Sequence, residues 1–277
     1  MKRNELLKKI KSQLENIDID DIKTVICEVL GIETKDYVLK TEFSDEEVQE
    51  IDEVVAKLKN NMPLDKILGR KCFFGRDFVT NCDVLSPRKE TEILVEQALK
   101  LLKNGKGDVL DLCCGSGCIG LSVACENDGA RVVMSDISPL ALDVAKQNAE
   151  RLGAKNVEFV QGDMFEGLKH GEKFDIIISN PPYIQTNTIA TLSPQVRCFD
   201  PILALDGGGD GLKFYRQIAS HGGEFLKPGG VVCVEIGFDQ GIAVQQLFKT
   251  AGYETQLIKD YDQNDRVVVA KKREEND

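Results

Sequence analysis

From Gly107 onward the chain alternates short apolar runs with segments of helical length. The runs are rich in branched residues, which is typical of strands that are buried on both faces. Strands that alternate with helices in this way favour a largely parallel sheet. We therefore predict an α/β domain with strands at residues 108–112, 131–136, 157–160, 174–179, 231–236, 255–258 and 266–271.

The strand that begins at Phe174 ends abruptly at Asn180-Pro181-Pro182-Tyr183. Neither proline has a backbone N–H, and the φ angle of each is nearly fixed, so the strand cannot continue. Such a stiff turn directs the Asn180 amide and the Tyr183 ring outward at the carboxyl end of a strand, where open α/β sheets bind ligands. The turn could also be an ordinary loop terminator, because Asn-Pro and Pro-Pro are common in turns.

Glycines and polar side chains also lie at the ends of the three preceding strands. The glycines after the first strand allow a tight turn in front of a helix N-terminus. A carboxylate at the end of the second strand, Asp136, can accept both hydrogen bonds of a ribose diol. With Asn180, this set suits a nucleoside ligand that has an ammonium group and no phosphates. The candidate ligand-binding residues are Asp111, Cys113, Cys114, Gly115, Ser116, Gly117, Asp136, Asp163, Met164 and Asn180.

Three interpretations of this set remain open from the residues alone. The spacing G-x-G-x-x-G at 115–120, followed by Asp136, matches an NAD-binding fingerprint, although no obvious acid or base for hydride transfer accompanies it. In an S-adenosylmethionine site, the glycine turn would lie along the amino-acid part, Asp136 would hold the ribose, and Asp163 and Met164 would bracket the adenine. In a purely structural interpretation the acids cap helices, as Asp136 could do at Pro139.

The formal net charge of −11 argues against a nucleic-acid substrate. Proteins that bind nucleic acids need a basic surface, because phosphate contacts supply much of the affinity. A DNA adenine-N6 or cytosine-N4 methyltransferase could use the same Asn-Pro-Pro-Tyr turn on a flipped base. The segments around 185–200 and 206–213, however, carry only Arg197 and Lys213 as basic residues. We therefore expect no direct contact with nucleic acid.

The first 70 residues predict helices only. Apolar residues recur at helical spacing at positions 6, 10 and 14 and again at 22, 25 and 29. Ser44 and Glu47 form a capping box that begins a further helix, which ends at 60–63. We expect a small helical bundle, followed by a β-hairpin with its turn at Gly75-Arg76.

The nine cysteines predict free thiols in a reducing cytoplasm, because most of them lie in apolar contexts. Cys113, Cys114 and Cys118 are close in sequence, but both histidines lie far from them, so we expect no metal site. The chain has no run of about 18 apolar residues and no signal-peptide core, so we expect no membrane segment.

From about residue 5 to 272 the chain resembles the protein-(glutamine-N5) methyltransferases that modify peptide chain release factors. Asn-Pro-Pro-Tyr alone is not specific, since DNA amino-methyltransferases resemble it as well. The wider set of motifs is specific. It comprises residues 63–64, 67–69, 85–88, 90–92, 111–112, 115–117, 136–138, 180–183, 200–201, 204–208, 210–212, 215, 235–237 and 264–266.

The resemblance implies a class I S-adenosylmethionine-dependent methyltransferase, with a Rossmann-like, seven-stranded sheet whose last strand is antiparallel. A small all-α domain at 1–72 would dock the substrate, a β-hairpin linker would cover 73–90, and the methyltransferase domain would cover 91–277. The reaction would move a methyl group from S-adenosyl-L-methionine to the glutamine of the Gly-Gly-Gln motif in class-1 release factors, leaving S-adenosyl-L-homocysteine. We expect a cytoplasmic monomer.

The resemblance also assigns catalysis and substrate binding to Asn180, Pro181, Pro182 and Tyr183. The Asn180 oxygen and the Pro181 carbonyl would each accept one N–H of the substrate amide, and Tyr183 would wall the pocket.

The chain departs from the family at three positions. Cys113 and Cys114 replace a Gly-Thr pair, so cofactor affinity would fall if position 113 needs a positive φ. Met164 replaces a common Trp or Leu, and Lys89 replaces a second proline.

Overall fold

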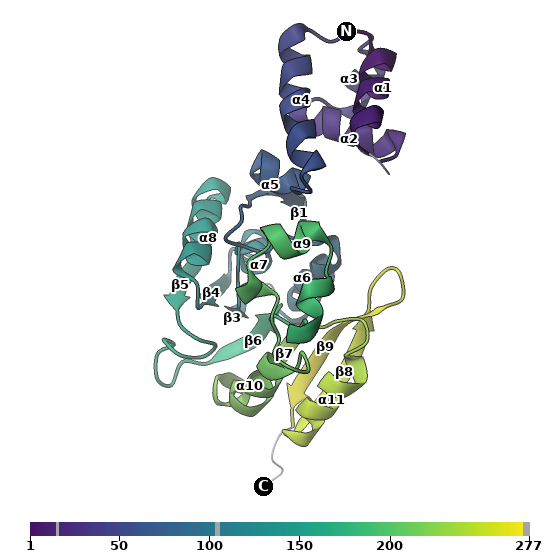
Figure 1. Cartoon of the computed structure of the whole chain (residues 1–277). Coiled ribbons are helices and arrows are strands. Elements are labelled where there is room, and N and C mark those ends of the chain that lie inside the picture. The colour runs from purple at the N-terminus through teal and green to yellow at the C-terminus, as the bar shows by residue number, and fades with distance from the viewer. Residues whose placement is uncertain (15–16, 103–105, 274–277) are drawn as a thin grey trace. The chain divides into compact units, whose positions relative to one another are not determined.

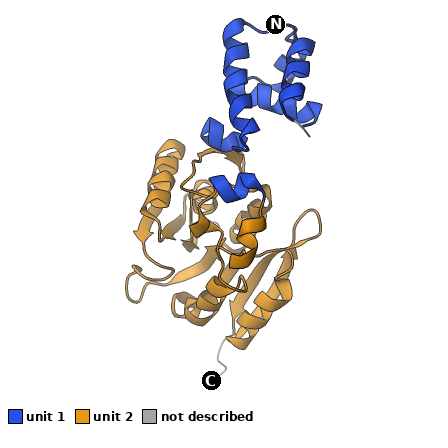
Figure 2. Ribbon diagram, in the orientation of Figure 1, with its two compact units in different colours: residues 1–69, 193–199 blue, residues 70–192, 200–277 orange. Residues whose placement is uncertain are grey.

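The computed structural model describes residues 1–14, 17–102 and 106–273. The chain forms two compact units (Figure 2). One, called the helical unit below, comprises residues 1–69 and 193–199. The other, called the sheet unit, comprises residues 70–192 and 200–277.

The helical unit has the helices that the apolar spacing predicts. Leu6 and Ile10 of the first helix and Ile22 and Ile26 of the second are fully buried in one apolar cluster. The capping box is also confirmed, since the Ser44 hydroxyl accepts from the backbone N–H of Glu47 and the Glu47 carboxylate accepts from that of Ser44. The helices are α1 (Arg3–Gln13), α2 (Ile19–Leu30), α3 (Thr34–Leu39), α4 (Asp45–Lys59), α5 (Leu64–Leu68) and α9 (Pro194–Phe199).

The sheet unit is built on a sheet with the strand order β5-β4-β3-β6-β7-β9-β8, seven strands within the described residues (Figure 1). Strands β5, β4, β3, β6 and β7 are parallel to one another, and β9 is antiparallel to its neighbours β7 and β8. The predicted seven-stranded sheet with an antiparallel last strand is therefore confirmed. The strands are β3 (Gly107–Leu112), β4 (Ala130–Asp136), β5 (Val157–Gln161), β6 (Phe174–Ser179), β7 (Leu226–Glu235), β8 (Tyr253–Lys259) and β9 (Asp265–Lys272).

Helices pack on both faces of this sheet. Neighbouring strand residues such as Val109 and Leu110 belong to different apolar clusters, because successive side chains of a strand point to opposite faces. One cluster contains residues of α6 (Glu92–Leu101), α7 (Cys118–Glu126) and α8 (Pro139–Leu152), and the other contains residues of α10 (Lys213–His221) and α11 (Gly241–Thr250). Burial on both faces explains why the strands are apolar throughout. Short 3₁₀ helices lie in the segments between these strands and helices: η1 (Lys89–Thr91), η2 (Thr186–Thr191), η3 (Ile202–Ala204) and η4 (Gly222–Glu224).

Two segments differ from expectation in their bounds. The hairpin strands are β1 (Arg70–Phe73) and β2 (Arg76–Val79), so the two units divide after Gly69 rather than after residue 72. The strand predicted at 231–236 is longer in the structure, because residues 227–230 lie inside β7 as a bulge, where the register shifts between the pairs Phe174–Leu226 and Ile176–Val231. Gly229 has a φ of +74°, which glycine adopts without strain, and this lets the strand resume.

No helix in the described ranges is long and apolar enough to cross a membrane.

Candidate active site

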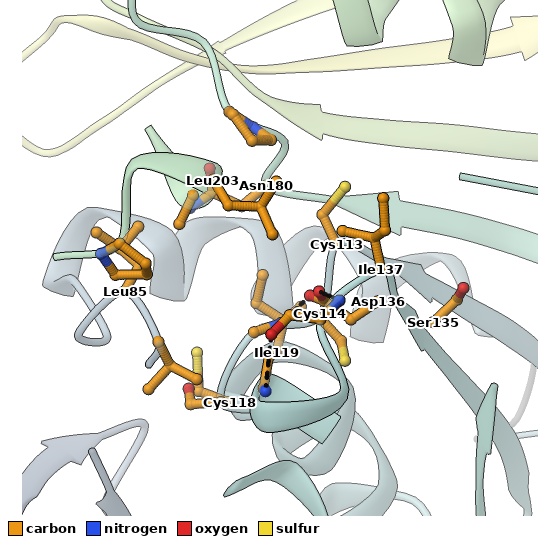
Figure 3. Close-up of a pocket in the computed structure, with 18 of the residues that line it drawn as sticks. Leu85, Cys113, Cys114, Cys118, Ile119, Ser135, Asp136, Ile137, Asn180 and Leu203 are labelled. Atoms are coloured by element: carbon orange, nitrogen blue, oxygen red, sulfur yellow. Dashed lines mark hydrogen bonds between the residues drawn. The ribbon is translucent and has the colours of Figure 1, made fainter. Parts of the chain in front are cut away.

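A cavity of about 170 Å³ lies in the sheet unit at the carboxyl ends of the parallel strands (Figure 3). Its lining includes residues that follow β3, β4, β5 and β6 directly, which is the edge where the polar residues were predicted to gather. Nine of the predicted residues line it together: Cys113, Cys114, Gly115, Ser116, Asp136, Asp163, Met164, Asn180 and Pro182. In Figure 3, Asn180 lies with Leu203 on one side of the cavity, and Asp136 lies near Cys114 on another.

The two glycines of the turn after β3 have different surroundings. Both have a positive φ, +54° at Gly115 and +76° at Gly117. A Cβ on Gly115 would meet nothing within 4 Å, so its backbone is open to a ligand. A Cβ on Gly117 would lie 3.1 Å from both Ala145 and Leu121. Gly117 is therefore required where the turn packs closely against α7 and α8, and it lies outside the cavity lining.

Cys113 has a φ of +59°. This is the positive φ that glycine adopts without strain and for which we expected the cysteine to lower cofactor affinity. Its Sγ contacts the Sδ of Met164 at 3.8 Å. Burial raises the pKa of the Cys113 and Cys114 thiols well above the ordinary value, and that of Cys118 to about 12. These three cysteines line the cavity as neutral thiols rather than as nucleophilic thiolates.

Asp136 fastens the glycine turn to the end of β4. Its Oδ2 accepts from the N–H of Gly115, and its Oδ1 accepts from the N–H of Ser138, both at 2.9 Å. The N-cap of α8 is Ser138, whose hydroxyl accepts from Ala141, so the interpretation of Asp136 as a helix cap is wrong. Each oxygen of Asp136 keeps a further lone pair that can accept from a hydroxyl group in the cavity.

Asp111 lies below the turn and not on the cavity wall. It is fully buried, its Oδ2 accepts from the N–H of Gly120 at 2.8 Å, and its Oδ1 has no hydrogen-bond partner. Burial, with a contribution from the charge of Asp136, raises the pKa of Asp111 to about 8. The side chain holds the first turn of α7 against β3.

The Asn-Pro-Pro-Tyr turn divides between two hollows. Asn180 and Pro182 line the cavity, and the Asn180 Nδ2 donates to the Thr91 Oγ1 at 3.4 Å. Tyr183 instead lines a neighbouring hollow with Ile184, Phe238 and others. Burial raises the pKa of the Tyr183 hydroxyl to about 12. Pro181 lines neither hollow, so the structure separates two of the four predicted residues from the cavity.

Several residues at the site were not predicted from the sequence. Arg88 lines the cavity and pairs with the buried Asp200 at 3.1 Å, although its segment was expected to be a linker. Gln240 donates to the Tyr183 carbonyl at 3.1 Å and to that of Gly211, which joins the turn to a later loop. The signal available for Arg88 was its place in the 85–88 motif, whereas Gln240 lies in none of the motifs.

The lining fits S-adenosylmethionine better than a phosphate-bearing cofactor. Asp136 offers acceptors, Gly115 offers open backbone, and Ile137 and Met164 offer apolar surface. Arg88, one of the cationic residues in the lining, already pairs with Asp200. Within the described residues, no three His, Cys, Asp or Glu side chains are grouped so that they could hold a metal ion.

Comparison with known proteins agrees with this fold. Residues 79–195 match the family model of the methyltransferase small domain, and residues 5–69 match that of the PrmC N-terminal domain. The crystal structure of a methyltransferase from Pyrococcus furiosus shares the fold, with a TM-score of 0.57 and 19% sequence identity over 78% of this chain and 96% of that one. The fold and the site define a class I S-adenosylmethionine-dependent methyltransferase.

The sequence comparison is more specific. The release factor glutamine methyltransferase of Agrobacterium fabrum is 41% identical over 257 residues, which cover 90% of this chain and 88% of that protein. The protein of the same name from Bacillus subtilis is 42% identical over 240 residues, which cover 84% and 83%. The chain belongs to the release factor glutamine methyltransferase family, and it is an enzyme whose methyl donor is S-adenosylmethionine. These matches favour neither the DNA methyltransferase nor the NAD-dependent alternative.

Proposed function

We propose that this enzyme methylates the side-chain amide nitrogen of the glutamine in the Gly-Gly-Gln motif of class-1 peptide chain release factors. The names of the relatives support the substrate. The observation that carries the chemistry is the turn after β6, which puts the Asn180 amide on the wall of the cavity.

The difficulty of the reaction is that an amide nitrogen is a poor nucleophile, because its lone pair is delocalised into the carbonyl. S-adenosylmethionine, when bound, supplies a methyl group on a sulfonium ion. The Asn180 Oδ1 would accept one N–H of the substrate amide, and the carbonyl group of Pro181, which the peptide bond joins to Pro182 of the cavity lining, would accept the other. With both N–H groups held, the amide nitrogen can pyramidalise and free its lone pair for the methyl group. The two acceptors would also stabilise the positive charge that develops on nitrogen as the methyl–nitrogen bond forms and the methyl–sulfur bond breaks. The nitrogen then loses one proton to water, and S-adenosyl-L-homocysteine is the leaving group. Because Nδ2 of Asn180 donates to Thr91, its Oδ1 is the atom left to accept.

The proposed roles of the cofactor-binding residues follow from their positions in the cavity. Asp136 would accept from the ribose hydroxyls, and the turn at 113–116 would lie along the amino-acid part. Asp163 and Met164 would bracket the adenine. Tyr183, in the neighbouring hollow, would contact the substrate chain on either side of the glutamine.

The proposal includes a monomeric enzyme that acts in the cytoplasm without direct contact with nucleic acid. The net charge of −11 supports the last point, because an acidic surface repels phosphates. The substrate is then a protein loop, which the helical unit helps to dock.

The test is mass spectrometry of a release factor after incubation with the enzyme and S-adenosylmethionine. We expect one added methyl on the loop glutamine. Asn180→Ala should lower the rate by about 10²-fold or more and keep S-adenosylhomocysteine binding, since it removes an acceptor for the developing charge. Asn127→Ala is the matched control, because Asn127 lies at the end of α7 that is remote from the cavity. Near-normal turnover by Asn180→Ala would contradict the mechanism, and methyl transfer to duplex DNA instead of protein would contradict the substrate.

A further inference from the structure

Glu235, the last residue of β7, is a buried carboxylate that the mechanism above does not use. Its side chain is almost fully enclosed, and its Oε2 has no hydrogen-bond partner. The Tyr215 hydroxyl donates to its backbone carbonyl at 2.8 Å and so fixes the end of the strand without serving the carboxylate. Burying a carboxylate with an unpaired oxygen costs free energy of folding. We therefore expect the carboxylate to act on a polar group next to it.

The neighbours of this carboxylate include the site. Ser179 of β6 pairs with Val234 of β7, so the next residues along the two parallel strands, Asn180 and Glu235, lie beside one another. Burial raises the pKa of Glu235 to about 7, and Thr91 and Asn180 act in the opposite direction. Thr91 and Asn180 are themselves joined, since Nδ2 of Asn180 lies 3.4 Å from Oγ1 of Thr91. Glu235, Thr91 and Asn180 therefore form one polar group, drawn from β7, η1 and the end of β6, in which Thr91 and Asn180 line the cavity and Glu235 does not.

A group of this composition can set the orientation of a primary amide. The oxygen and nitrogen ends of Asn180 have nearly the same shape, so packing alone does not decide which end faces the cavity. A carboxylate and a hydroxyl oxygen at the back of the side chain accept from Nδ2 and disfavour Oδ1 there. The orientation that leaves Oδ1 facing the cavity is the one that methyl transfer to an amide requires.

We propose that Glu235, assisted by Thr91, is a positioning residue, whose ionised carboxylate holds the Nδ2 end of Asn180 and so presents Oδ1 to the substrate glutamine. The inference rests on the function proposed above. It adds a requirement that Asn180 alone does not impose, because the protonation state of a residue outside the cavity then controls the reaction.

Protonated Glu235 has a hydroxyl that can donate to Oδ1, which favours the wrong amide orientation. The rate should therefore rise with pH as Glu235 loses its proton near pH 7. Arg266 favours the ionised form and Glu90 opposes it. Burial raises the pKa values of Tyr183 and Cys118 to about 12 and that of Tyr215 well above its ordinary value, so all three groups keep their protons in this window. The titratable or charged groups that face Glu235 are Arg266 of β9, Glu90 of η1, Tyr183, Tyr215 of α10 and Cys118 of α7.

The test compares kcat and KM of wild type, Glu235→Gln and Thr91→Val between pH 6 and pH 8.5, with a release factor as substrate. Wild-type kcat should rise about tenfold from pH 6 to pH 8, following ionisation of one group. Glu235→Gln should have a flat profile and a kcat at least about tenfold below wild type at pH 8, with KM for S-adenosylmethionine within about twofold. Thr91→Val should lower kcat several-fold and keep the pH dependence.

The matched control is Glu172→Gln, which removes a carboxylate that pairs with Arg131 and does not line the cavity. Its profile should equal that of wild type. A wild-type kcat that is constant from pH 6 to pH 8.5 overturns the inference without any variant, as does a Glu235→Gln enzyme with the wild-type kcat and profile. If Glu235→Gln fails to bind S-adenosylhomocysteine, the inference is judged from the pH profile of the wild-type kcat and from the kcat of Thr91→Val. A constant wild-type kcat, or a Thr91→Val enzyme with the wild-type kcat, then overturns it. Absence of glutamine methylation by wild type at every pH refutes the proposed function itself, which is a different result.

Discussion

Replacing Asp111 with asparagine tests whether the carboxyl below the glycine turn is neutral in the folded enzyme. Asp111 is fully buried and its pKa is raised from 3.8 to about 8, chiefly by loss of solvent. In the unfolded chain the same carboxyl is ionised above about pH 4. A raised carboxyl pKa makes folding less favourable as pH rises between these two values, and the loss is complete above the higher one.

The magnitude follows from the two pKa values. Each pH unit between them costs about 1.4 kcal/mol. Because the slope flattens close to pH 8, Asp111 should destabilise the wild type by about 2 kcal/mol more at pH 8 than at pH 6. Asn at position 111 keeps an acceptor for the Gly120 N–H but brings an unpaired NH₂ group, whose cost of about 1–3 kcal/mol is the same at both pH values. The variant should therefore gain about 2 kcal/mol relative to wild type between pH 6 and pH 8.

Urea unfolding followed by far-ultraviolet circular dichroism measures this difference, and suits a chain that has no tryptophan. Glu235 also titrates in this range, but it is present in both proteins and cancels in the comparison. Asp143→Asn is the control, because it removes a carboxyl that is mostly exposed on α8. If Asp111→Asn and wild type differ by the same free energy of unfolding at both pH values, Asp111 is not neutral in the folded state and the reasoning from burial is wrong.

Two further predictions concern packing and capping. Gly120→Ala should destabilise the enzyme by about 1–3 kcal/mol, because the new Cβ would lie 2.8 Å from Met134 and 2.9 Å from Asp111. Urea unfolding measures this loss of stability, and an unchanged unfolding midpoint would contradict the prediction. Ser44→Ala should weaken the start of α4 by about 1 kcal/mol by removing the acceptor for Glu47. Hydrogen exchange in the full chain should then be several-fold faster in the first turn of α4, whereas equal rates would show that the capping box contributes nothing.

The elements of the fold could be predicted from the sequence because their signals are local. Apolar runs of strand length identify each strand, and the capping box at Ser44 identifies the start of α4 within the described chain. The bounds that were missed have equally local reasons. The bulge at Gly229 continues a strand through residues that usually form a turn, and β1 begins at Arg70 because pairing with β2 extends it.

The site could be predicted in part. Residues at or just beyond the ends of strands, such as Gly115, Asp136 and Asn180, were assigned to the ligand edge and do line one cavity, since the carboxyl ends of parallel strands share an edge. The direction of each side chain was not predictable, because a shift of one residue along a strand exchanges its faces. Asp111, which is inside β3, therefore lies outside the lining.

The sequence by itself determined the class of fold, the family and the turn that carries Asn180, because these depend on residues that are neighbours in the chain. Only the tertiary structure decided which distant residues surround that turn. Thr91, Asn180 and Glu235 are far apart in sequence and meet because β6 pairs with β7 and residues 89–91 pack beside them. The low dielectric that perturbs the Asp111 and Glu235 carboxyls likewise exists only after the helices close over both faces of the sheet.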